Sequence, residues 1–204
     1  MNVVVATSNA GKLAELTVLL APLGVTLSSQ RQLAITQANE TASSFVENAL
    51  IKARHAAAAT GWPAIADDSG LVVPALGGAP GVLSARYAGA DANPAANNRK
   101  LVAALADIAD RRAYFYCALV FMRSADDPAP LIASADWHGR IIDISRGNGG
   151  FGYDPHFFVE LLAKTAAELP ASIKNEISHR GKAAAILVGS IARALESMSR
   201  SGDA

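Results

Sequence analysis

Hydrophobic and polar positions along the chain follow two periods, one typical of strands and one typical of helices. Short apolar runs predict buried strands over residues 2–6 and 25–28. Leucines spaced three and four positions apart predict an amphipathic helix over 11–21. The chain is therefore expected to open with a strand, a helix and a second strand.

Three more helices are predicted from capping residues and apolar spacing. A serine and a glutamate three positions later form a capping-box pair at the start of a helix over 45–60. A proline in the first helical position starts a helix over 94–108. Apolar residues at helical spacing predict a closing helix over 180–198.

The remaining segments predict strands that follow one another without an intervening helix. The stretch "PAIADDSG" is expected to run from a strand into a turn, and strands are expected over 113–122, 131–137 and 140–144. Residues 146–155, "RGNGGFGYDP", form a glycine-dense loop. Because consecutive strands pair as hairpins, we expect an α/β fold with a mixed central sheet flanked by helices.

The composition favours one compact domain over residues 1–204. Hydrophobic residues make up 51% of the 204 residues and charged residues only 18%, against about a quarter charged in an average soluble protein. Lys and Arg together number 18, as do Asp and Glu. The chain therefore has no net charge that would indicate polymeric nucleic acid or a membrane as a partner. Any attraction for an anion must be local.

Several features favour a cytoplasmic protein. The single cysteine, Cys117, lies in an apolar run and is expected to be a buried structural thiol. The chain opens on a strand-like run without the basic and apolar regions of a signal peptide. No apolar stretch reaches the roughly 18 residues of a membrane span.

The stretch "ATSNAGKLAEL" is a candidate phosphate-binding loop. A strand that feeds a helix through a small polar turn presents backbone amides and the positive end of the helix dipole to an anion. Lys12 adds a cation one turn into the helix. The likeness to a Walker A loop is superficial, because Leu13 occupies the Ser/Thr position that would hold magnesium. An ordinary strand-to-helix turn is the alternative.

Two adjacent carboxylates in "ADDSG" are candidates for acid–base or metal chemistry. Side chains of neighbouring residues in a strand point to opposite faces, so one of Asp67 and Asp68 can face a cleft while the other braces the structure. Such a carboxylate can hold a divalent cation or take a proton from water. The alternative is that both aspartates only form a turn before Ser69 and Gly70.

Two later stretches could contact a ligand. In "GNGGFGYDP", glycines allow close backbone approach, and Phe151 and Tyr153 offer flat faces on which a base could stack. A plain glycine-rich hairpin is the alternative. In "KNEISHRGKA", the donors of Lys174, His179 and Arg180 gather near the start of the closing helix; a structural helix start is the alternative.

Taken together and in this order, these stretches resemble the inosine triphosphate pyrophosphatase family, also called dITP/XTP pyrophosphatases. The matching stretches are "VVVATSNAGKLAEL", "SFVENALIKARHAA", "PAIADDSGLVVPALGGAPGVLSARYAG", "GGFGYDPHFF", "KTAAEL" and "ISHRGKA". They extend from residue 3 almost to the end of the chain. Two departures are Ser8, where glycine is common in the family, and "VELLAKT", which replaces a more usual turn containing proline or glycine.

The resemblance implies a fold of two lobes around an active-site cleft, a homodimer, and an activity. Such enzymes cleave non-canonical purine nucleoside triphosphates (ITP, dITP, XTP) to the monophosphate and pyrophosphate with Mg²⁺, which cleanses the nucleotide pool. By analogy, Glu40 and Asp68 carry the metal, and Asp68 is the catalytic base. Asn48 and Lys52, on one face of their helix, are further candidates near the phosphates. The implied substrate contacts are Thr7, Ser8, Asn9, Ala10, Gly11, Lys12, Lys52, Ser69, Phe151, Gly152, Tyr153, Asp154, Lys174, His179 and Arg180.

Two alternative functions remain open at this point. A phosphotransferase acting on the same nucleotides is disfavoured by the incomplete Walker A loop. A nucleotide sensor without turnover is disfavoured because Glu40, Asp68 and Lys12 are all present. The products distinguish them, since a kinase makes a diphosphate and a sensor makes nothing.

Overall fold

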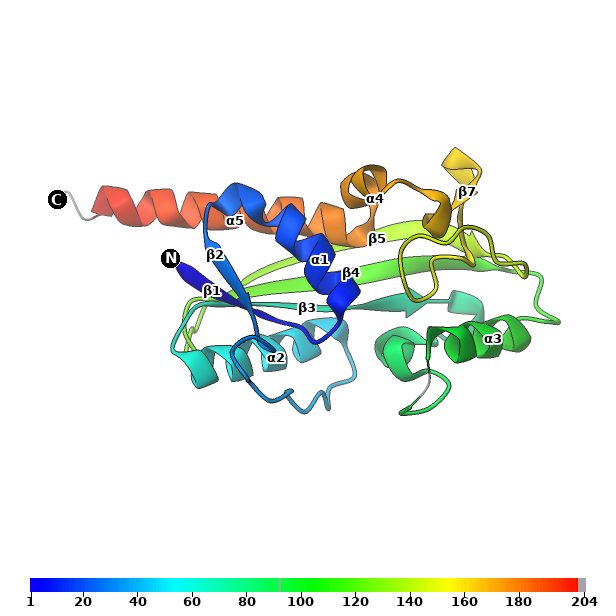
Figure 1. Cartoon of the computed structure of the whole chain (residues 1–204), viewed down its shortest axis with the longest axis horizontal. Coiled ribbons are helices and arrows are strands. Elements are labelled where there is room, and N and C mark those ends of the chain that lie inside the picture. The colour runs from blue at the N-terminus through cyan, green and yellow to red at the C-terminus, as the bar shows by residue number, and fades with distance from the viewer. Residues whose placement is uncertain (92, 202–204) are drawn as a thin grey trace. The chain divides into compact units, whose positions relative to one another are not determined.

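The computed structural model describes residues 1–91 and 93–201, with side chains described as far as residue 194. Seven strands form one sheet in the order β2-β1-β3-β4-β5-β6-β7 (Figure 1). The strands are β1 (Asn2–Ala6), β2 (Thr26–Ser29), β3 (Ala64–Val72), β4 (Arg112–Met122), β5 (Leu131–Ile141), β6 (Phe157–Val159) and β7 (Lys164–Thr165). β1 pairs in parallel with β2 and β3, whereas β6 pairs antiparallel with β5 and β7. The predicted mixed sheet is therefore confirmed.

Five α-helices and five short 3₁₀ helices are found in the described part of the chain. The α-helices are α1 (Ala10–Leu19), α2 (Phe45–Thr60), α3 (Pro94–Ala104), α4 (Ala171–Ile177) and α5 (His179–Ser201). The 3₁₀ helices are η1 (Ala21–Leu23), η2 (Pro74–Leu76), η3 (Gly81–Arg86), η4 (Glu160–Leu162) and η5 (Ala166–Glu168). None of the helices in the described residues is long and apolar enough to cross a membrane.

The chain divides into two compact units, and each is described by itself. Unit 1 contains Met1–Asp68, Ala118–Ala135 and the chain from Arg180 onward, and unit 2 contains Ser69–Cys117 and Asp136–His179. The strands β3, β4 and β5 each continue from one unit into the other. The sequence prediction of one domain over residues 1–204 stays a prediction.

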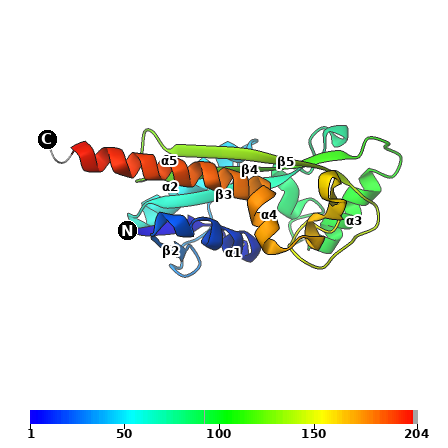
Figure 2. The same cartoon turned by 90° about the horizontal axis from the view of Figure 1, so that it is seen from above.

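Unit 1 is built on three parallel strands. Val3, Val4 and Val5 of β1 are fully buried, as expected for a strand with a neighbour on each side and helices over its faces. α2 lies on one side of these strands and α5 lies on the other (Figures 1 and 2). Five buried alanine and asparagine side chains form the face that α2 turns to the sheet.

Unit 2 has an aromatic core. The rings of Phe115, Trp137 and Phe157 contact one another, with centroid separations of 4.6–6.3 Å. Aliphatic side chains such as Leu71 and Leu101 complete this cluster. The core therefore joins β3, β4, β5, β6 and α3 within the unit.

Two strand predictions were wrong for the same physical reason. β3 continues without a turn through Asp67, Asp68 and Gly70, and β5 is one strand where two were predicted, because it passes through Gly139. A Cβ atom on Gly70 would lie 2.6 Å from the Gly81 carbonyl oxygen, and one on Gly139 would lie 2.5 Å from the Phe158 carbonyl oxygen. These glycines permit close backbone approach inside strands and do not form turns.

Two helix predictions also need correction, and one helix was not predicted. The helix predicted over 94–108 ends at Ala104. The segment before the closing helix contains a separate helix, α4, which the sequence analysis missed. The closing helix begins one residue early, at His179, and extends to Ser201.

Candidate active site

The centre of β3 places two adjacent aspartates in two different side-chain networks. Because β3 is extended, Asp67 and Asp68 point to opposite faces of the sheet. Asp67 contacts Lys12 of α1 and Arg180 of α5, while Asp68 contacts Lys52 of α2. The predicted division of the two carboxylates between two faces is confirmed, although both lie within the strand and not at its end.

The Asp67 network (Lys12, Glu15, Asp67 and Arg180) is a buried set of ion pairs. Lys12 Nζ lies 2.6 Å from Asp67 Oδ1, and Arg180 Nε donates to Asp67 Oδ2 at 2.8 Å. Arg180 also donates from its Nη1 to Glu15 Oε2 at 2.5 Å. Burial raises the pKa of Asp67, but the charges and hydrogen bonds of Arg180 and Lys12 outweigh it, so the pKa lies well below its usual value. Asp67 is therefore ionised at neutral pH and pairs with two cations.

The Asp68 network (Glu40, Lys52 and Asp68) shifts the pKa of its aspartate in the opposite direction. Lys52 Nζ lies 2.6 Å from Asp68 Oδ1 and 3.2 Å from Glu40 Oε2. The second oxygen, Asp68 Oδ2, is buried and has no hydrogen-bond partner among the described residues. Burial raises the pKa of Asp68, and the opposing charge of Lys52 does not fully cancel this effect. A carboxylate with a raised pKa and an unused oxygen is a candidate base.

The raised pKa of Lys52 keeps its ammonium group charged. Burial lowers the pKa of Lys52, but the nearby charges of Asp68 and Glu40 raise it by more. The network therefore holds two carboxylates against one ammonium group, a formal charge of about −1 by ordinary side-chain ionisation.

These groups fit a divalent cation of the magnesium type. Among the described residues, no group of three or more His, Cys, Asp or Glu side chains is arranged to hold a metal ion. Mg²⁺ does not need such a cage, because it commonly binds one or two carboxylates together with substrate phosphates and waters. Asp68 has one oxygen without a partner among the described residues. With the half-buried carboxylate of Glu40, it supplies that kind of donor set, and Lys52 contacts Asp68 through its other oxygen and Glu40 through Oε2.

The opening loop has the local geometry of an anion-binding helix start. Asn9 caps α1 by accepting a hydrogen bond from the Lys12 amide at 3.1 Å, and Thr7 Oγ1 accepts one from the Asn9 amide at 3.2 Å. Ser8, Asn9 and Ala10 are exposed, whereas Gly11 and Lys12 are half-buried. The loop thus presents the first turn of the ten-residue helix α1 to solvent, and the half-buried Lys12 belongs to that turn.

Asn48 has a structural contact that the sequence analysis did not predict. The prediction placed Asn48 near the phosphates with Lys52. In the structure Asn48 is 1% exposed, and its side chain binds both backbone polar groups of Ala42. Its Oδ1 accepts from the Ala42 amide at 3.0 Å, and its Nδ2 donates to the Ala42 carbonyl at 3.2 Å. Asn48 therefore fixes the segment that carries Glu40, two residues before Ala42.

In unit 2, the glycine loop (residues 146–155) is held by Asp154. Asp154 Oδ2 accepts from the Phe151 amide at 2.8 Å and from Lys174 Nζ at 2.5 Å. The same Lys174 Nζ lies 4.8 Å from the centroid of the Phe151 ring. The hydroxyl of Tyr153 donates to the Ser84 carbonyl at 2.8 Å. The loop is thus a folded structure and not an open hairpin.

His179 belongs to the aromatic core of unit 2. Its ring stacks on Phe115 at 4.8 Å between centroids with 11° between the planes, and lies 6.4 Å from the centroid of Trp137. Only 4% of His179 is exposed. Ser69, the first residue of unit 2 on β3, is half-buried.

The predicted residues therefore gather in two places. Unit 1 brings together the opening loop, Lys12, Glu40, Lys52, Asp68 and Arg180, and unit 2 brings together Phe151, Gly152, Tyr153, Asp154 and Lys174 with the stacked His179. Glu15 was missed as a network member. Its position three residues after Lys12, on the same side of α1, was the available signal.

Unit 1 thus holds a carboxylate pair suited to a cation and a helix start suited to an anion. An α/β protein with both has the features of a phosphate-ester or anhydride enzyme. The chain belongs to the Ham1 family, whose model matches residues 3–189. The resemblance recognised from the sequence motifs is thereby confirmed.

Curated relatives and solved structures agree with this assignment. The dITP/XTP pyrophosphatase of Nitrosomonas europaea is 59% identical over 186 residues, which cover 91% of this chain and 92% of that protein. The dITP/XTP pyrophosphatase of Ralstonia nicotianae is 56% identical, covering 91% of this chain and 94% of that protein. The structure of a HAM1 protein from Coxiella burnetii has a TM-score of 0.88 at 48% identity, covering 95% of this chain and 99% of that one.

Proposed function

We propose that this protein hydrolyses non-canonical purine nucleoside triphosphates (ITP, dITP and XTP) to the nucleoside monophosphate and pyrophosphate. The relatives that are 52–59% identical over nearly their whole length are named dITP/XTP pyrophosphatases. The observation within this chain that carries the proposal is Asp68, whose one oxygen is held by Lys52 and whose other oxygen has no partner in the described residues.

The chemistry follows from the two networks of unit 1. Asp68 orients a water and accepts its proton as the water oxygen attacks the α-phosphorus. The bond from that phosphorus to the bridging oxygen breaks, and pyrophosphate leaves with the bonding electrons. Lys12 and the amides of the opening loop stabilise the charge on the phosphates, since a preorganised cation and helix start act where charge develops.

We propose Mg²⁺ as the metal, held by Glu40 and Asp68. When bound, it would neutralise phosphate charge and orient the reacting groups. Lys52 keeps the two carboxylates together before the ion and substrate arrive.

We propose that the opening loop, Thr7 to Lys12, and Lys52 contact the triphosphate. Phe151, Gly152 and Tyr153 contact the base, with Asp154 and Lys174 holding Phe151 in place for stacking. Ser69, His179 and Arg180 complete the substrate contacts by family analogy. Arg180 acts in part through Asp67, which it shares with Lys12.

The family resemblance also supports a homodimer of a single pyrophosphatase domain, working in the cytoplasm on free nucleotides. The equal numbers of acidic and basic residues give no general attraction for polymeric nucleic acid.

Product analysis tests the proposal. The purified protein is incubated with ITP and either Mg²⁺ or EDTA, and the products are separated by ion-exchange chromatography. We expect IMP and pyrophosphate in equal amounts, with Mg²⁺ only. IDP as the product would indicate a phosphotransferase or a γ-phosphatase, and unchanged ITP would indicate a sensor.

A further inference from the structure

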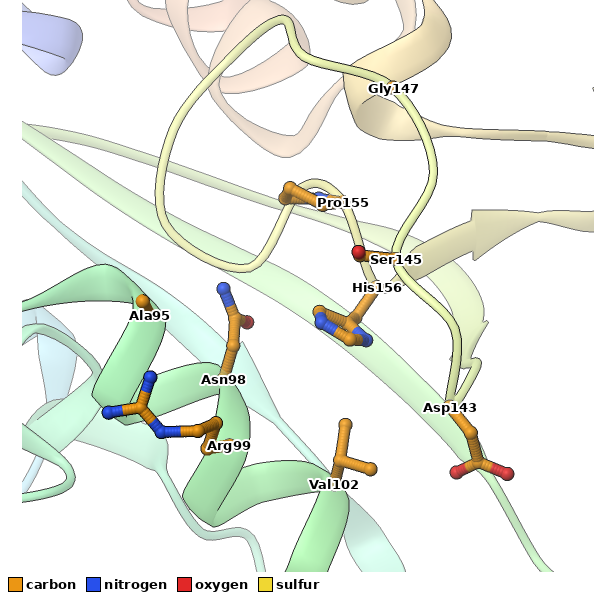
Figure 3. Close-up of a pocket in the computed structure, with 9 residues that line it drawn as sticks. All are labelled: Ala95, Asn98, Arg99, Val102, Asp143, Ser145, Gly147, Pro155 and His156. Atoms are coloured by element: carbon orange, nitrogen blue, oxygen red, sulfur yellow. The ribbon is translucent and has the colours of Figure 1, made fainter.

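Asn98 connects α3 to the glycine loop within unit 2. Its side-chain Nδ2 donates to the Gly152 carbonyl at 2.9 Å. Figure 3 shows the amide nitrogen of Asn98 directed at the loop from the helix below it. Gly152 follows Phe151 directly and has a φ of 64°, in the left-handed region that glycine tolerates and other residues rarely adopt. The hydrogen bond therefore fixes a peptide next to the aromatic residue of the loop.

The other half of the same amide has no compensating contact. Asn98 is 9% exposed, and its Oδ1 is buried without a hydrogen-bond partner among the described residues. A buried acceptor without a partner destabilises a folded protein. Stability alone would favour an apolar side chain of similar size at this position. The hydrogen bond from Asn98 Nδ2 to the Gly152 carbonyl therefore explains why an amide side chain stands at this position.

The surroundings of this hydrogen bond leave the loop room to move. A cavity of about 470 Å³ lies beside Asn98 (Figure 3). Its lining includes Arg99 and Val102 of α3, Pro155 at the end of the glycine loop, and His156 directly after it. Side chains therefore do not fill the space between α3 and this end of the glycine loop. Packing cannot replace a missing hydrogen bond there.

The opposite side of the loop is fixed differently. Asp154 binds the Phe151 amide and Lys174, and Lys174 lies over the Phe151 ring. Asn98 and Lys174 therefore give two separate contacts to the segment that carries Phe151. Loss of the Asn98 contact leaves the Lys174 contact, so the loop stays folded but its position is no longer fixed from α3.

We propose that Asn98 is a positioning residue that sets Phe151 for stacking on the purine base. This inference rests on the proposed function, because the stacked ligand is the purine of the substrate. Asn98 contacts the backbone of the loop, and we assign its role to that contact. Its effect should thus fall on binding of the base and not on binding of the phosphates or on the chemical step.

The test compares Asn98→Leu, which removes both the donor and the unpartnered oxygen, with Asn98→Gln, which keeps an amide. Arg99→Leu is the matched control, since Arg99 is the next residue of α3 and lines the same cavity. Calorimetry measures the affinity of each variant for IMP and for inorganic tripolyphosphate, and steady-state kinetics gives kcat and KM for ITP. Hydrogen exchange of the Phe151 and Asp154 amides reports the loop without any ligand, and the melting temperature reports stability.

For Asn98→Leu we expect about tenfold weaker IMP binding and a similar rise in KM for ITP, the size of a lost base–aromatic stack. Tripolyphosphate affinity, kcat and the melting temperature should stay near the wild-type values, while exchange in the loop rises. Asn98→Gln should recover part of the IMP affinity, and Arg99→Leu should behave as wild type.

Equal losses of IMP and tripolyphosphate affinity, or unchanged loop exchange in Asn98→Leu, would overturn the inference. Wild-type protein that neither binds IMP nor hydrolyses ITP would instead overturn the proposed function. A wild-type enzyme that is active while Asn98→Leu binds IMP normally would overturn the role of Asn98 alone.

Discussion

At the scale of single residues, the environment gives Asp67 and Asp68 opposite properties. Asp67 is paired with two cations, and its pKa is lowered well below the usual value in spite of burial. Asp68 is paired with one cation near a second carboxylate, Glu40, and burial leaves its pKa raised. The two faces of the sheet thus shift the pKa values of neighbouring aspartates in opposite directions, which fits a structural role for Asp67 and the proposed catalytic role for Asp68.

Asp68→Asn should lower kcat/KM for ITP by at least about 10²-fold, because an amide cannot accept a proton and is a poor magnesium ligand. The fold should survive, since Asn can still accept a hydrogen bond from Lys52. Steady-state kinetics and the melting temperature check both parts. Near-normal turnover in this variant, with a collapse in Asp67→Asn, would reverse the two assignments.

Asp67→Asn should mainly lower stability, and the loss should depend on pH. Because the pKa of Asp67 is lower in the folded protein than in the unfolded chain, its ionisation stabilises the fold above the unfolded pKa near 4. This stabilisation is lost as the pH falls through the folded pKa. Removing one partner of buried ion pairs typically costs about 3 kcal/mol.

Urea denaturation of wild type and Asp67→Asn at a series of pH values measures this effect. The difference in unfolding free energy should be largest near pH 7 and should shrink as the pH falls below about 4. A difference that stays constant down to pH 2 would show that Asp67 does not stabilise the fold through its charge.

At the scale of elements, the site depends on one long strand and on a segment held by side chains. β3 delivers Asp67 and Asp68 from its interior, and the segment between β2 and α2 delivers Glu40. That segment has no regular secondary structure around Glu40, so its position depends on contacts such as those of Asn48 with Ala42.

Asn48→Asp should weaken the metal site while leaving the nucleotide contacts intact. The carboxylate keeps the acceptor for the Ala42 amide but replaces the donor with an oxygen that faces the Ala42 carbonyl, which costs roughly 1–3 kcal/mol for a buried group. We expect a several-fold rise in the Mg²⁺ concentration for half-maximal activity. Glu47→Gln, an exposed change on the same helix, is the control and should leave the Mg²⁺ dependence unchanged.

The same elements explain which parts of the structure the sequence could predict. Apolar runs and caps predicted β1 and α2 to the residue, because their signals are local. The continuity of β3 and β5 was missed. Gly70 and Gly139 are required there because other parts of the chain, at the Gly81 and Phe158 carbonyls, approach the strand closely. Local sequence does not show such contacts. The carboxylates of the site were found from motifs. Glu15 was missed although its position three residues after Lys12 on α1 was a local signal. Its contact with Arg180 has no local signal, because it joins residues far apart in the chain.

At the scale of the whole molecule, the two kinds of proposed substrate contact are divided between the two units. The phosphate and metal residues belong to unit 1, and the glycine loop with Phe151 belongs to unit 2. β3 carries the chain directly from Asp68 of unit 1 to Ser69 of unit 2. Hydrolysis and base selection can thus be altered separately, as the Asp68 and Asn98 variants are designed to do.

Base selection is the central claim, and it concerns the group at position 6 of the purine. A 6-oxygen accepts hydrogen bonds, and we propose that a donor of His179, of Arg180 or of a backbone amide pairs with it. The 6-amino group of adenine would place donor against donor and leave buried groups unpaired, which allows discrimination of about 10⁴-fold. Guanine keeps the 6-oxygen, so its rejection depends on the 2-amino group.

The most direct test is kcat/KM for ITP, XTP, GTP and ATP, measured as pyrophosphate release with saturating Mg²⁺. We expect ITP and XTP to be the best substrates, GTP to be poor, and ATP to be slower than ITP by about 10⁴-fold. Hydrolysis of ATP as efficient as that of ITP would contradict the claim and would make the protein a general nucleotide pyrophosphatase.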